Sequence, residues 1–222
     1  FSHCAILDIR EGRYAELVER HGPRVSLFQC DVSSLESVSA AFDAVDAWGP
    51  PLSALVNSAG IAHFVSTLDL EHEDWRRVMD VNIDGTLHPS VLAARRMGDA
   101  GGGAIVNLAS VAGMFGWPRR AAYSTSKAAV AGLTRTLAVE WAASGIRVNA
   151  VAPGYIATEL VEKLIADGNI DYETYAPLAA LNRFGTPAEV AQPILFLLSS
   201  GAAFITGVTL PIDGGFAATK VP

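Results

Sequence analysis

The chain has 222 residues, half of them hydrophobic, and a formal net charge of −7. This length and composition suit one globular domain with a packed core. The negative charge argues against a nucleic-acid partner, which requires a basic stripe. Two cysteines, Cys4 and Cys30, cannot form a disulfide framework, and free thiols suit a reducing cytoplasm.

Short apolar runs ended by turn-forming residues predict buried strands at 4–8, 24–31, 52–60, 103–110, 146–154 and 208–215. Helical patterns lie between them, at about 11–21, 34–48, 71–99, 123–144 and 187–199. Strands that alternate with helices indicate a parallel sheet covered by helices on both faces. We therefore expect a single α/β domain over residues 1–222, doubly wound and Rossmann-like.

Two later stretches need separate interpretation. Residues 154–187 carry only weak helical patterns, and a long excursion in a compact domain is usually a lid or binding loop, so we expect a substrate loop there. Residues 190–212 carry no charge and are long enough for a membrane span. Pro193, Pro211 and the break at 199–201 instead favour a buried helix, a loop and a buried strand, with no membrane partner.

Ligands of open parallel sheets bind beyond the carboxyl ends of the strands. The predicted strands end at Asp8, Asp31, "NSAG" (57–60), "NLASVAG" (107–113) and "APG" (152–154). Small residues there let a flat molecule approach the backbone closely. Asp8 suits hydrogen bonds from ribose hydroxyls if a further strand and glycine loop precede it; otherwise it is a solvated turn residue or a helix cap.

Tyr123 and Lys127 lie four residues apart on a predicted helix and therefore share one face. Acid–base chemistry near neutrality requires the tyrosine pKa, normally near 10, to fall by about two to three units. An adjacent ammonium favours the phenolate, and Ser110 before this helix can hydrogen-bond an alcohol or carbonyl oxygen. The Tyr–x–x–x–Lys spacing alone is common, and an exposed helix pair explains it better.

The combination of motifs is more specific. A strand that ends in Ser110, with Tyr123 thirteen positions later, follows "NSAG" and an asparagine, Asn82, in "VMDVNIDG". Together these motifs resemble the short-chain dehydrogenase/reductase family, and the resemblance runs from Asp8 to "LPIDGG" at 210–215. It implies an NAD(H)-dependent oxidoreductase that interconverts a secondary alcohol and a ketone by hydride transfer.

The resemblance also assigns roles to a catalytic set of four residues. Tyr123 would be the general acid/base, and Ser110 would hold the substrate oxygen. Lys127 would bind the nicotinamide ribose and depress the pKa of the tyrosine. Asn82 would kink its helix and hold a water that links Lys127 to solvent.

The implied NAD contacts lie at the strand ends. Asp8, followed by Ile9, resembles the acidic residue that selects NAD because a 2′-phosphate would meet its charge, although Arg10 could soften that repulsion. The other implied contacts, besides Tyr123 and Lys127, are Asp31 and Val32 at the adenine, Asn57, Ala59 and Gly60 in a supporting turn, and Pro153, Gly154, Ile156 and Thr158 beside the nicotinamide.

Two departures from the family pattern stand out. "NSAG" replaces the commoner Asn-Asn-Ala-Gly, which is a mild change. The family also begins with a strand and a Gly-x-x-x-Gly-x-Gly loop that wraps the pyrophosphate, and the sequence does not supply them. We expect that strand to lie mid-sheet, between the strands at 4–8 and 52–60, in an N-terminal segment of roughly 30 residues that this sequence lacks.

The substrate is a small alcohol or ketone that the sequence specifies poorly. The opening of its binding pocket is expected to be apolar and to contain Met114, Phe115, Trp117, Tyr155 and Leu160, although ordinary packing explains these residues equally well.

The helical patterns at 71–99 and 123–144 resemble the family's dimer-forming pair and predict a homo-oligomer, with a tetramer expected. No metal is expected. The alternatives are a non-catalytic cofactor-binding or interaction protein on the same fold, and an inactive truncated form.

Overall fold

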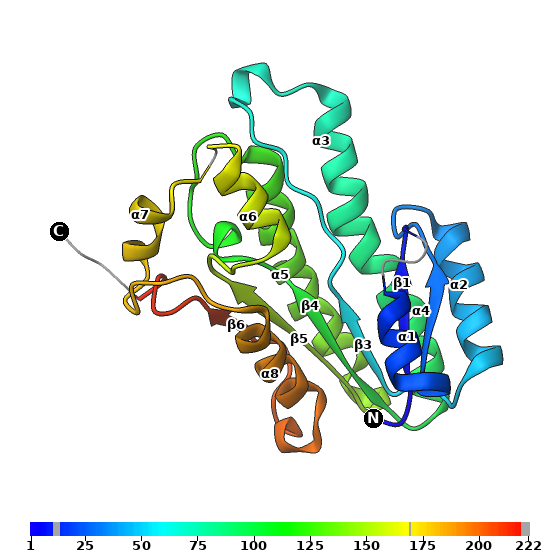
Figure 1. The fold of residues 1–222 in the computed structure, drawn as a ribbon. Helices are drawn as coiled ribbons and strands as arrows, with labels where there is room; N and C mark the ends of the chain where they lie inside the picture. Colours follow the sequence, from blue (N-terminus) through cyan, green and yellow to red (C-terminus); the bar gives the residue numbers. More distant parts are fainter. Residues whose placement is uncertain (11–13, 169, 219–222) are drawn as a thin grey trace.

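The computed structural model describes residues 1–10, 14–168 and 170–218. Every strand pair is parallel, and helices cover both faces of the sheet (Figure 1), so the predicted fold class is confirmed. The strands are β1 (Cys4–Asp8), β2 (Val25–Gln29), β3 (Ala54–Asn57), β4 (Gly103–Leu108), β5 (Ile146–Pro153) and β6 (Thr209–Ile212).

The helices follow the predicted alternation. They are α1 (Ala15–His21), α2 (Leu35–Trp48), α3 (His72–Met79), α4 (Gly85–Asp99), α5 (Ala121–Trp141), α6 (Glu159–Ala166), α7 (Tyr172–Tyr175) and α8 (Pro187–Leu198). A π-helical segment, η3 (Asp80–Asp84), joins α3 to α4. Short 3-10 turns include η4 (Val111–Gly113) and η7 (Ser200–Ala202). The first three residues of the helix predicted at 11–21 lie outside the described residues.

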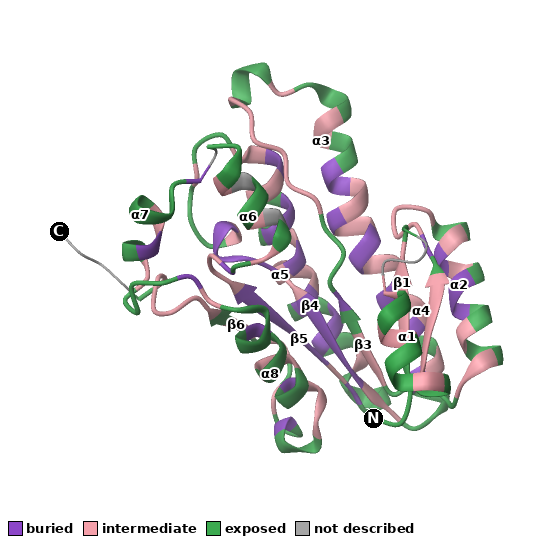
Figure 2. Cartoon of the chain, in the orientation of Figure 1, coloured by how far each residue is buried: buried purple, intermediate pink, exposed green. Residues whose placement is uncertain are grey.

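Two hydrophobic clusters hold the helices against the sheet. One packs α2, α4 and α5 against β4 and β5, with Phe42, Met97 and Ile105 at its centre. The other packs α8 and η7 against the opposite face, through Val106 and Leu197. Figure 2 shows β4 and β5 buried along most of their length. Buried on both faces, these two strands account for the continuous apolar runs in the sequence.

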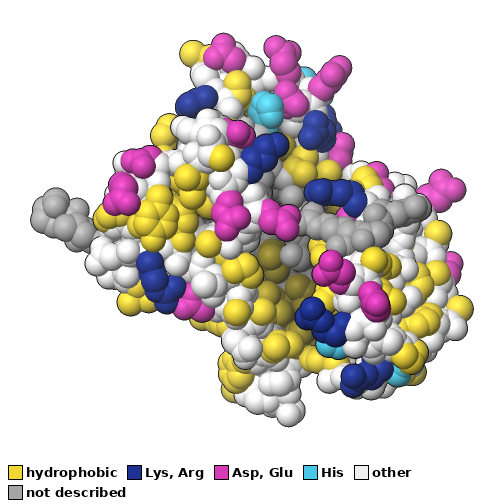
Figure 3. Space-filling model, in the orientation of Figure 1, with side chains coloured by type: hydrophobic (Ala, Val, Ile, Leu, Met, Phe, Trp, Pro, Cys, Tyr) yellow, Lys and Arg dark blue, Asp and Glu magenta, His cyan; other side chains and the backbone are white. Residues whose placement is uncertain are grey.

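The sheet is divided into two parts. Strands β1 and β2 form one, and β3, β4, β5 and β6 form the other in that order. Figure 1 places β1 next to the four-stranded part, and no strand of the described ranges lies between β1 and β3. The additional strand expected from the sequence would lie at this position. Hydrophobic side chains are visible in the hollow between the two parts (Figure 3).

The helical pattern at 71–99 is not one regular helix. The backbone changes to π-helical geometry at η3, where Asn82 is fully buried, and then returns to α-helical geometry in α4. A π-bulge of this kind adds a residue to one turn and is often found at functional sites. Pro89 lies within α4, which begins directly after η3.

The uncharged stretch at 190–212 forms most of α8, the turn η7 and β6, as predicted. Helix α8 begins with a capping box, in which Thr186 and Glu189 bond each other's backbone N–H. Within the described ranges, no helix combines the length and the apolar character that a membrane crossing requires. Cys4 and Cys30 are both free thiols.

Candidate active site

The centre of the site lies at the carboxyl end of β4, against α5. Lys127 is buried, and its Nζ donates a 2.7 Å hydrogen bond to the carbonyl of Leu108. The same Nζ lies 5.8 Å from the ring centroid of Tyr123. Ser110 caps η4, and its hydroxyl acts on the Tyr123 phenol by lowering the pKa of that group. Strand and helix therefore bring Ser110, Tyr123 and Lys127 together, as the sequence predicted.

A glycine lets η4 lie directly on α5. A Cβ atom added at Gly113 would lie 2.6 Å from the backbone nitrogen of Ala128 and 2.6 Å from the carbonyl carbon of Lys127. Real Cβ atoms do not approach backbone this closely, so only glycine fits here. This close approach sets the position of Ser110 relative to α5.

Asn82 uses its whole side chain to fix the segment beside the site. Its Oδ1 accepts from the backbone N–H of Ile61 at 2.8 Å, and its Nδ2 donates to the Ile61 carbonyl at 3.0 Å. Nδ2 also donates to Ser126 Oγ at 2.9 Å, and Ser126 Oγ donates to the Tyr123 carbonyl at 2.8 Å. The π-helical segment thus positions both the 60–61 loop and the helix that carries Tyr123.

A second buried polar network lies behind the site. Asn57 Nδ2 donates to Ser90 Oγ and to Asn107 Oδ1, both at 2.8 Å, and Asn107 Nδ2 donates to Thr134 Oγ1 at 3.0 Å. These bonds join β3 and β4 to α4 and α5. Sequence reasoning singled out Asn57 but missed its partners, although Asn107 is a polar residue inside the apolar run "GAIVNL".

Burial shifts the two central ionisable groups in opposite directions. It raises the pKa of the Tyr123 phenol, and the hydrogen bond with Ser110 and the charge of Arg120 oppose this by lowering it. Burial also lowers the pKa of Lys127 to about 8. Ser110 and Arg120 therefore favour the phenolate in this arrangement.

Asp8 and Asp31, the two acidic residues predicted to contact the adenosine, make different hydrogen bonds. Asp8 ends β1, and its Oδ1 accepts the backbone N–H of Arg10 at 2.9 Å. Its Oδ2 has no hydrogen-bond partner in the described part of the chain. Ile9 is 58% exposed. Asp31 Oδ1 instead accepts from the backbone and hydroxyl of Ser33, so this carboxylate stabilises its own turn.

The predicted turn after β3 approaches the site closely. A Cβ at Gly60 would lie 3.3 Å from both Lys127 Nζ and Asn82 Oδ1, and Ala59 beside it is exposed. On the adenosine side, Val32 packs so tightly on the start of α4 that a Cβ at Gly85 would lie 2.6 Å from its Cγ2. Glycine at these two positions therefore allows close contacts along this edge of the sheet.

The segment after β5 is held mainly by its backbone. Gly154 donates its N–H to the Ile212 carbonyl at 3.0 Å, just after Pro153. Ile156 is buried and forms an isolated parallel bridge with Gly185, which closes the excursion over 154–187. The Thr158 hydroxyl caps α6 by accepting from Val161. Of this predicted set, Ile156 and Thr158 use their side chains within the protein.

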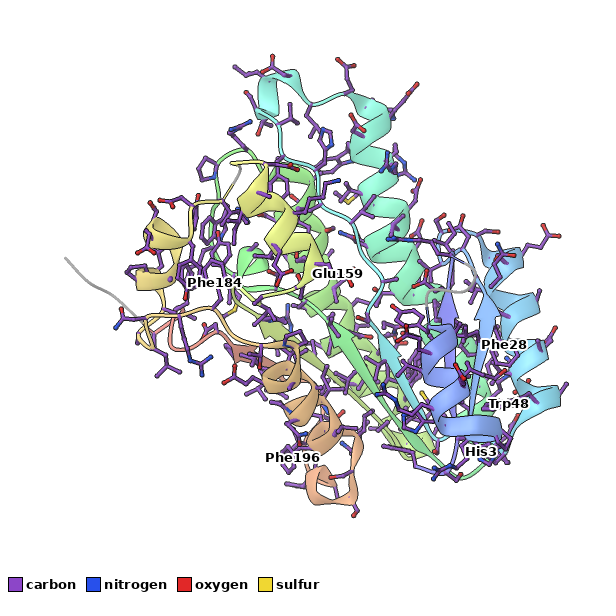
Figure 4. The ribbon with its side chains drawn as sticks, viewed as in Figure 1. His3, Phe28, Trp48, Glu159, Phe184 and Phe196 are labelled. Carbon is purple, nitrogen blue, oxygen red and sulfur yellow. The ribbon has the colours of Figure 1, made fainter. Side chains whose placement is uncertain are left out.

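An aromatic cluster faces the site from the excursion. The Tyr155 ring stacks on Phe184 with centroids 5.3 Å apart and meets Trp117 at 6.1 Å. Trp117 also stacks on Phe216 at 5.6 Å. Figure 4 shows Phe184 among side chains that gather near α6 and α7. Met114 and Phe115 are exposed, and the Leu160 side chain lies outside the described residues.

Comparison with known proteins adds independent findings. A family model described as enoyl-(acyl carrier protein) reductase matches residues 3–217. A galactitol 2-dehydrogenase (L-tagatose-forming) of Cereibacter sphaeroides is 44% identical over 188 residues, covering 84% of this chain and 73% of that protein. A cis-4-hydroxycyclohexanecarboxylate dehydrogenase of Sinomonas cyclohexanicum is 42% identical over 214 residues, covering 95% and 85%.

A solved structure, ElxO with NADP bound, superimposes with a TM-score of 0.91 at 32% identity, covering 98% of this chain and 89% of that one.

The contact between η4 and α5 predicts that one methyl group added at Gly113 destabilises the protein. Gly113→Ala should lower the free energy of unfolding by about 1–3 kcal/mol, because the new Cβ meets rigid backbone. Gly116→Ala is the matched control: a Cβ there meets nothing within 4 Å, so its effect should stay within about 0.5 kcal/mol. Urea unfolding measures both, and equal midpoints for the two variants would contradict this account.

The buried ammonium predicts a pH-dependent stability. Below pH 8, Lys127 is charged in both the folded and the unfolded chain, and the folded state carries the cost of burial. As the pH rises from about 8 towards 10.5, the folded state releases this proton first, so stability increases. Relative to Lys127→Met, the wild type should gain roughly 2–3 kcal/mol across this range.

Urea unfolding at several pH values from 7 to 10 measures the difference. Lys163→Met, which removes an exposed lysine from α6, should keep the pH dependence of the wild type. Parallel stability curves for the wild type and Lys127→Met would show that Lys127 keeps its ordinary pKa.

Proposed function

The chain belongs to the short-chain dehydrogenase/reductase family, and we propose that it interconverts a secondary alcohol and a ketone with NAD(H), with Tyr123 as the general acid/base. It is an oxidoreductase that acts on CH–OH groups. The observation that carries the proposed mechanism is the joint placement of Ser110, Tyr123 and Lys127 at the carboxyl end of β4.

Each of these side chains has a task in alcohol oxidation. Ser110 hydrogen-bonds the alcohol oxygen and holds it beside the phenol. Tyr123, as phenolate, accepts the hydroxyl proton while the carbon loses hydride. Lys127 would hold the ribose hydroxyls of the nicotinamide cofactor, and its bond to the Leu108 carbonyl fixes the ammonium against β4. In ketone reduction Tyr123 returns the proton to the oxygen.

The residues present fit a nicotinamide dinucleotide. Glycine at position 60 leaves space beside Lys127 Nζ, where a Cβ would be crowded. Asp8 offers a carboxylate oxygen that has no hydrogen-bond partner among the described residues, at the end of β1, where it suits the ribose hydroxyls of the adenosine. When bound, the nicotinamide accepts or supplies the hydride. The Asp8 charge supports NAD over NADP, because a 2′-phosphate would lie against a carboxylate.

The substrate remains a small alcohol or ketone in this proposal. The names of the two relatives refer to a polyol and to a ring alcohol that carries a carboxylate. The excursion at 154–187 would form the substrate loop, since its aromatic residues lie against the loop that leads into α5. The rival proposal is a non-catalytic cofactor-binding or interaction protein on the same fold.

The oligomeric state and the cellular location of the protein are also proposed. We infer a homo-oligomer, with a tetramer favoured, because α5 still exposes apolar residues such as Val139, which is 80% accessible. A cytoplasmic location is supported by the two free thiols. Light scattering on the purified protein tests the oligomeric state.

Removing the Tyr123 hydroxyl should distinguish the proposed enzyme from a non-catalytic cofactor-binding or interaction protein. Tyr123→Phe should lower kcat about 10²–10⁴-fold, because the proton then has no positioned acceptor. NAD affinity, measured by fluorescence titration, should change little. Tyr172→Phe removes a hydroxyl from α7, away from Ser110 and Lys127, and should keep turnover. Undiminished turnover in Tyr123→Phe would remove Tyr123 from the mechanism.

The charge of Asp8 should decide the cofactor preference. The wild type should use NAD with at least about tenfold higher kcat/KM than NADP, since like charges brought together in a site cost several kcal/mol. Asp8→Asn should narrow this ratio, mainly by improving NADP. Asp99→Asn, at the exposed end of α4, is the control and should leave the ratio unchanged. A wild type that prefers NADP would overturn the assignment of Asp8.

A further inference from the structure

Arg120 stands among aromatic rings at the entrance to α5. Its guanidinium carbon lies 4.8 Å from the ring centroid of Phe64, 5.1 Å from that of Trp117 and 6.0 Å from that of Tyr155. One of its nitrogens donates a 3.3 Å hydrogen bond to the Tyr155 hydroxyl. The side chain is half-buried, so these rings replace much of the water that would otherwise solvate the cation.

This half-buried cation has no carboxylate partner within the described ranges. Arg76, Arg96 and Arg183 each pair with an aspartate or glutamate at 2.6–2.9 Å. Arg147 donates to three backbone carbonyls. Arg120 keeps most of its five N–H donors unused beside a neutral hydroxyl. A partly desolvated guanidinium with free donors is suited to a ligand that carries a negative charge.

A second donor in the same cluster also lacks an acceptor. The indole Nε1 of Trp117 is buried without a hydrogen-bond partner in the described part of the structure. Trp117 lies three residues before Arg120, and its ring contacts the ring of Tyr155. Buried polar atoms are normally satisfied, so an unpaired N–H beside an unpaired cation points to acceptor oxygens from a ligand.

The backbone immediately before Arg120 has an unusual conformation. Arg119 adopts a left-handed conformation with φ of 63°, and its carbonyl accepts from Val65 at 3.1 Å. Such a conformation is unfavourable for a non-glycine residue and persists where the surrounding structure imposes it. Arg120 follows at the start of α5, one helical turn before Tyr123, and its charge acts on the phenol.

We propose that Arg120 binds a carboxylate of the substrate, so that the enzyme acts on hydroxy acids and the corresponding keto acids. The proposal rests on the dehydrogenase function proposed above. The guanidinium takes the carboxylate oxygens in its planar fork, with the Trp117 N–H as an additional donor. The rings of Phe64 and Tyr155 pack against the carbon atoms between the carboxylate and the reacting carbinol.

Equilibrium binding tests the anion site without any turnover. Calorimetry should show that hexanoate binds and that neutral hexanamide, of similar shape, binds at least about tenfold more weakly. Arg120→Gln should reduce hexanoate affinity about 10- to 100-fold, the usual effect of losing a hydrogen bond to a charged group. Arg119→Gln removes the adjacent, exposed arginine and should bind hexanoate like the wild type. Arg120→Lys keeps the charge and should retain part of the affinity.

Kinetics test whether the anion is the substrate's own carboxylate. The acids 3-hydroxybutanoate, 4-hydroxypentanoate and 5-hydroxyhexanoate are compared with their methyl esters. In the wild type, kcat/KM should favour at least one acid over its ester, and Arg120→Gln should reduce that ratio about 10- to 100-fold. The readout is the ratio of kcat/KM for the acid to kcat/KM for its ester, because any effect of the substitution on Tyr123 is common to both substrates.

The two experiments separate this proposal from the function on which it rests. Turnover of the esters without a preference for any acid would keep the dehydrogenase and overturn the carboxylate site. Hexanoate binding that depends on Arg120, with no turnover of any alcohol, would keep the anion site and reject the dehydrogenase. Equal hexanoate affinity in the wild type and Arg120→Gln would overturn the proposal outright.

Discussion

The site depends on one buried amide. Asn82 has no exposed surface, and its side chain bonds both backbone groups of Ile61 and the hydroxyl of Ser126. An asparagine buried in this way is tolerated only because its polar atoms are satisfied, and an unpaired one would cost about 1–3 kcal/mol. The π-helical turn that presents Asn82 therefore fixes two things together, the loop after β3 and the helix that carries Tyr123.

Burial of charge is the second constraint. Lys127 lies in the interior with one carbonyl partner, and its pKa falls to about 8 as a result. The same burial disfavours the phenolate of Tyr123, so groups that stabilise negative charge matter most at this position. Ser110 and Arg120 provide that stabilisation in the free protein. The arrangement keeps a cation and a weak acid close together where water is scarce, which strengthens every interaction between them.

Two cations of different character border the reaction centre. Lys127 belongs to the sheet side, where Gly60 lies close to its ammonium and where the proposed cofactor would bind. Arg120 belongs to the outer side, where it lies against the rings of Trp117 and of Tyr155, the latter from the 154–187 excursion. A substrate placed between them can meet the phenol with its hydroxyl and the guanidinium with an acidic group. The loop that leads into α5 and ends at Arg120 would therefore also influence which substrate binds.

The sequence by itself determined the alternation of strands and helices, the fold class, and the placement of Ser110, Tyr123 and Lys127 at one edge of a parallel sheet. These features follow from local patterns: apolar runs, turn residues, and a four-residue spacing on a helix. The family resemblance implied a kink at Asn82, and only the tertiary structure decided that it takes the form of a π-helical turn in which the Asn82 side chain makes buried hydrogen bonds. It also decided which polar residues support the site and that Arg120 has no acidic partner in the described ranges, since both depend on contacts between residues far apart in the chain.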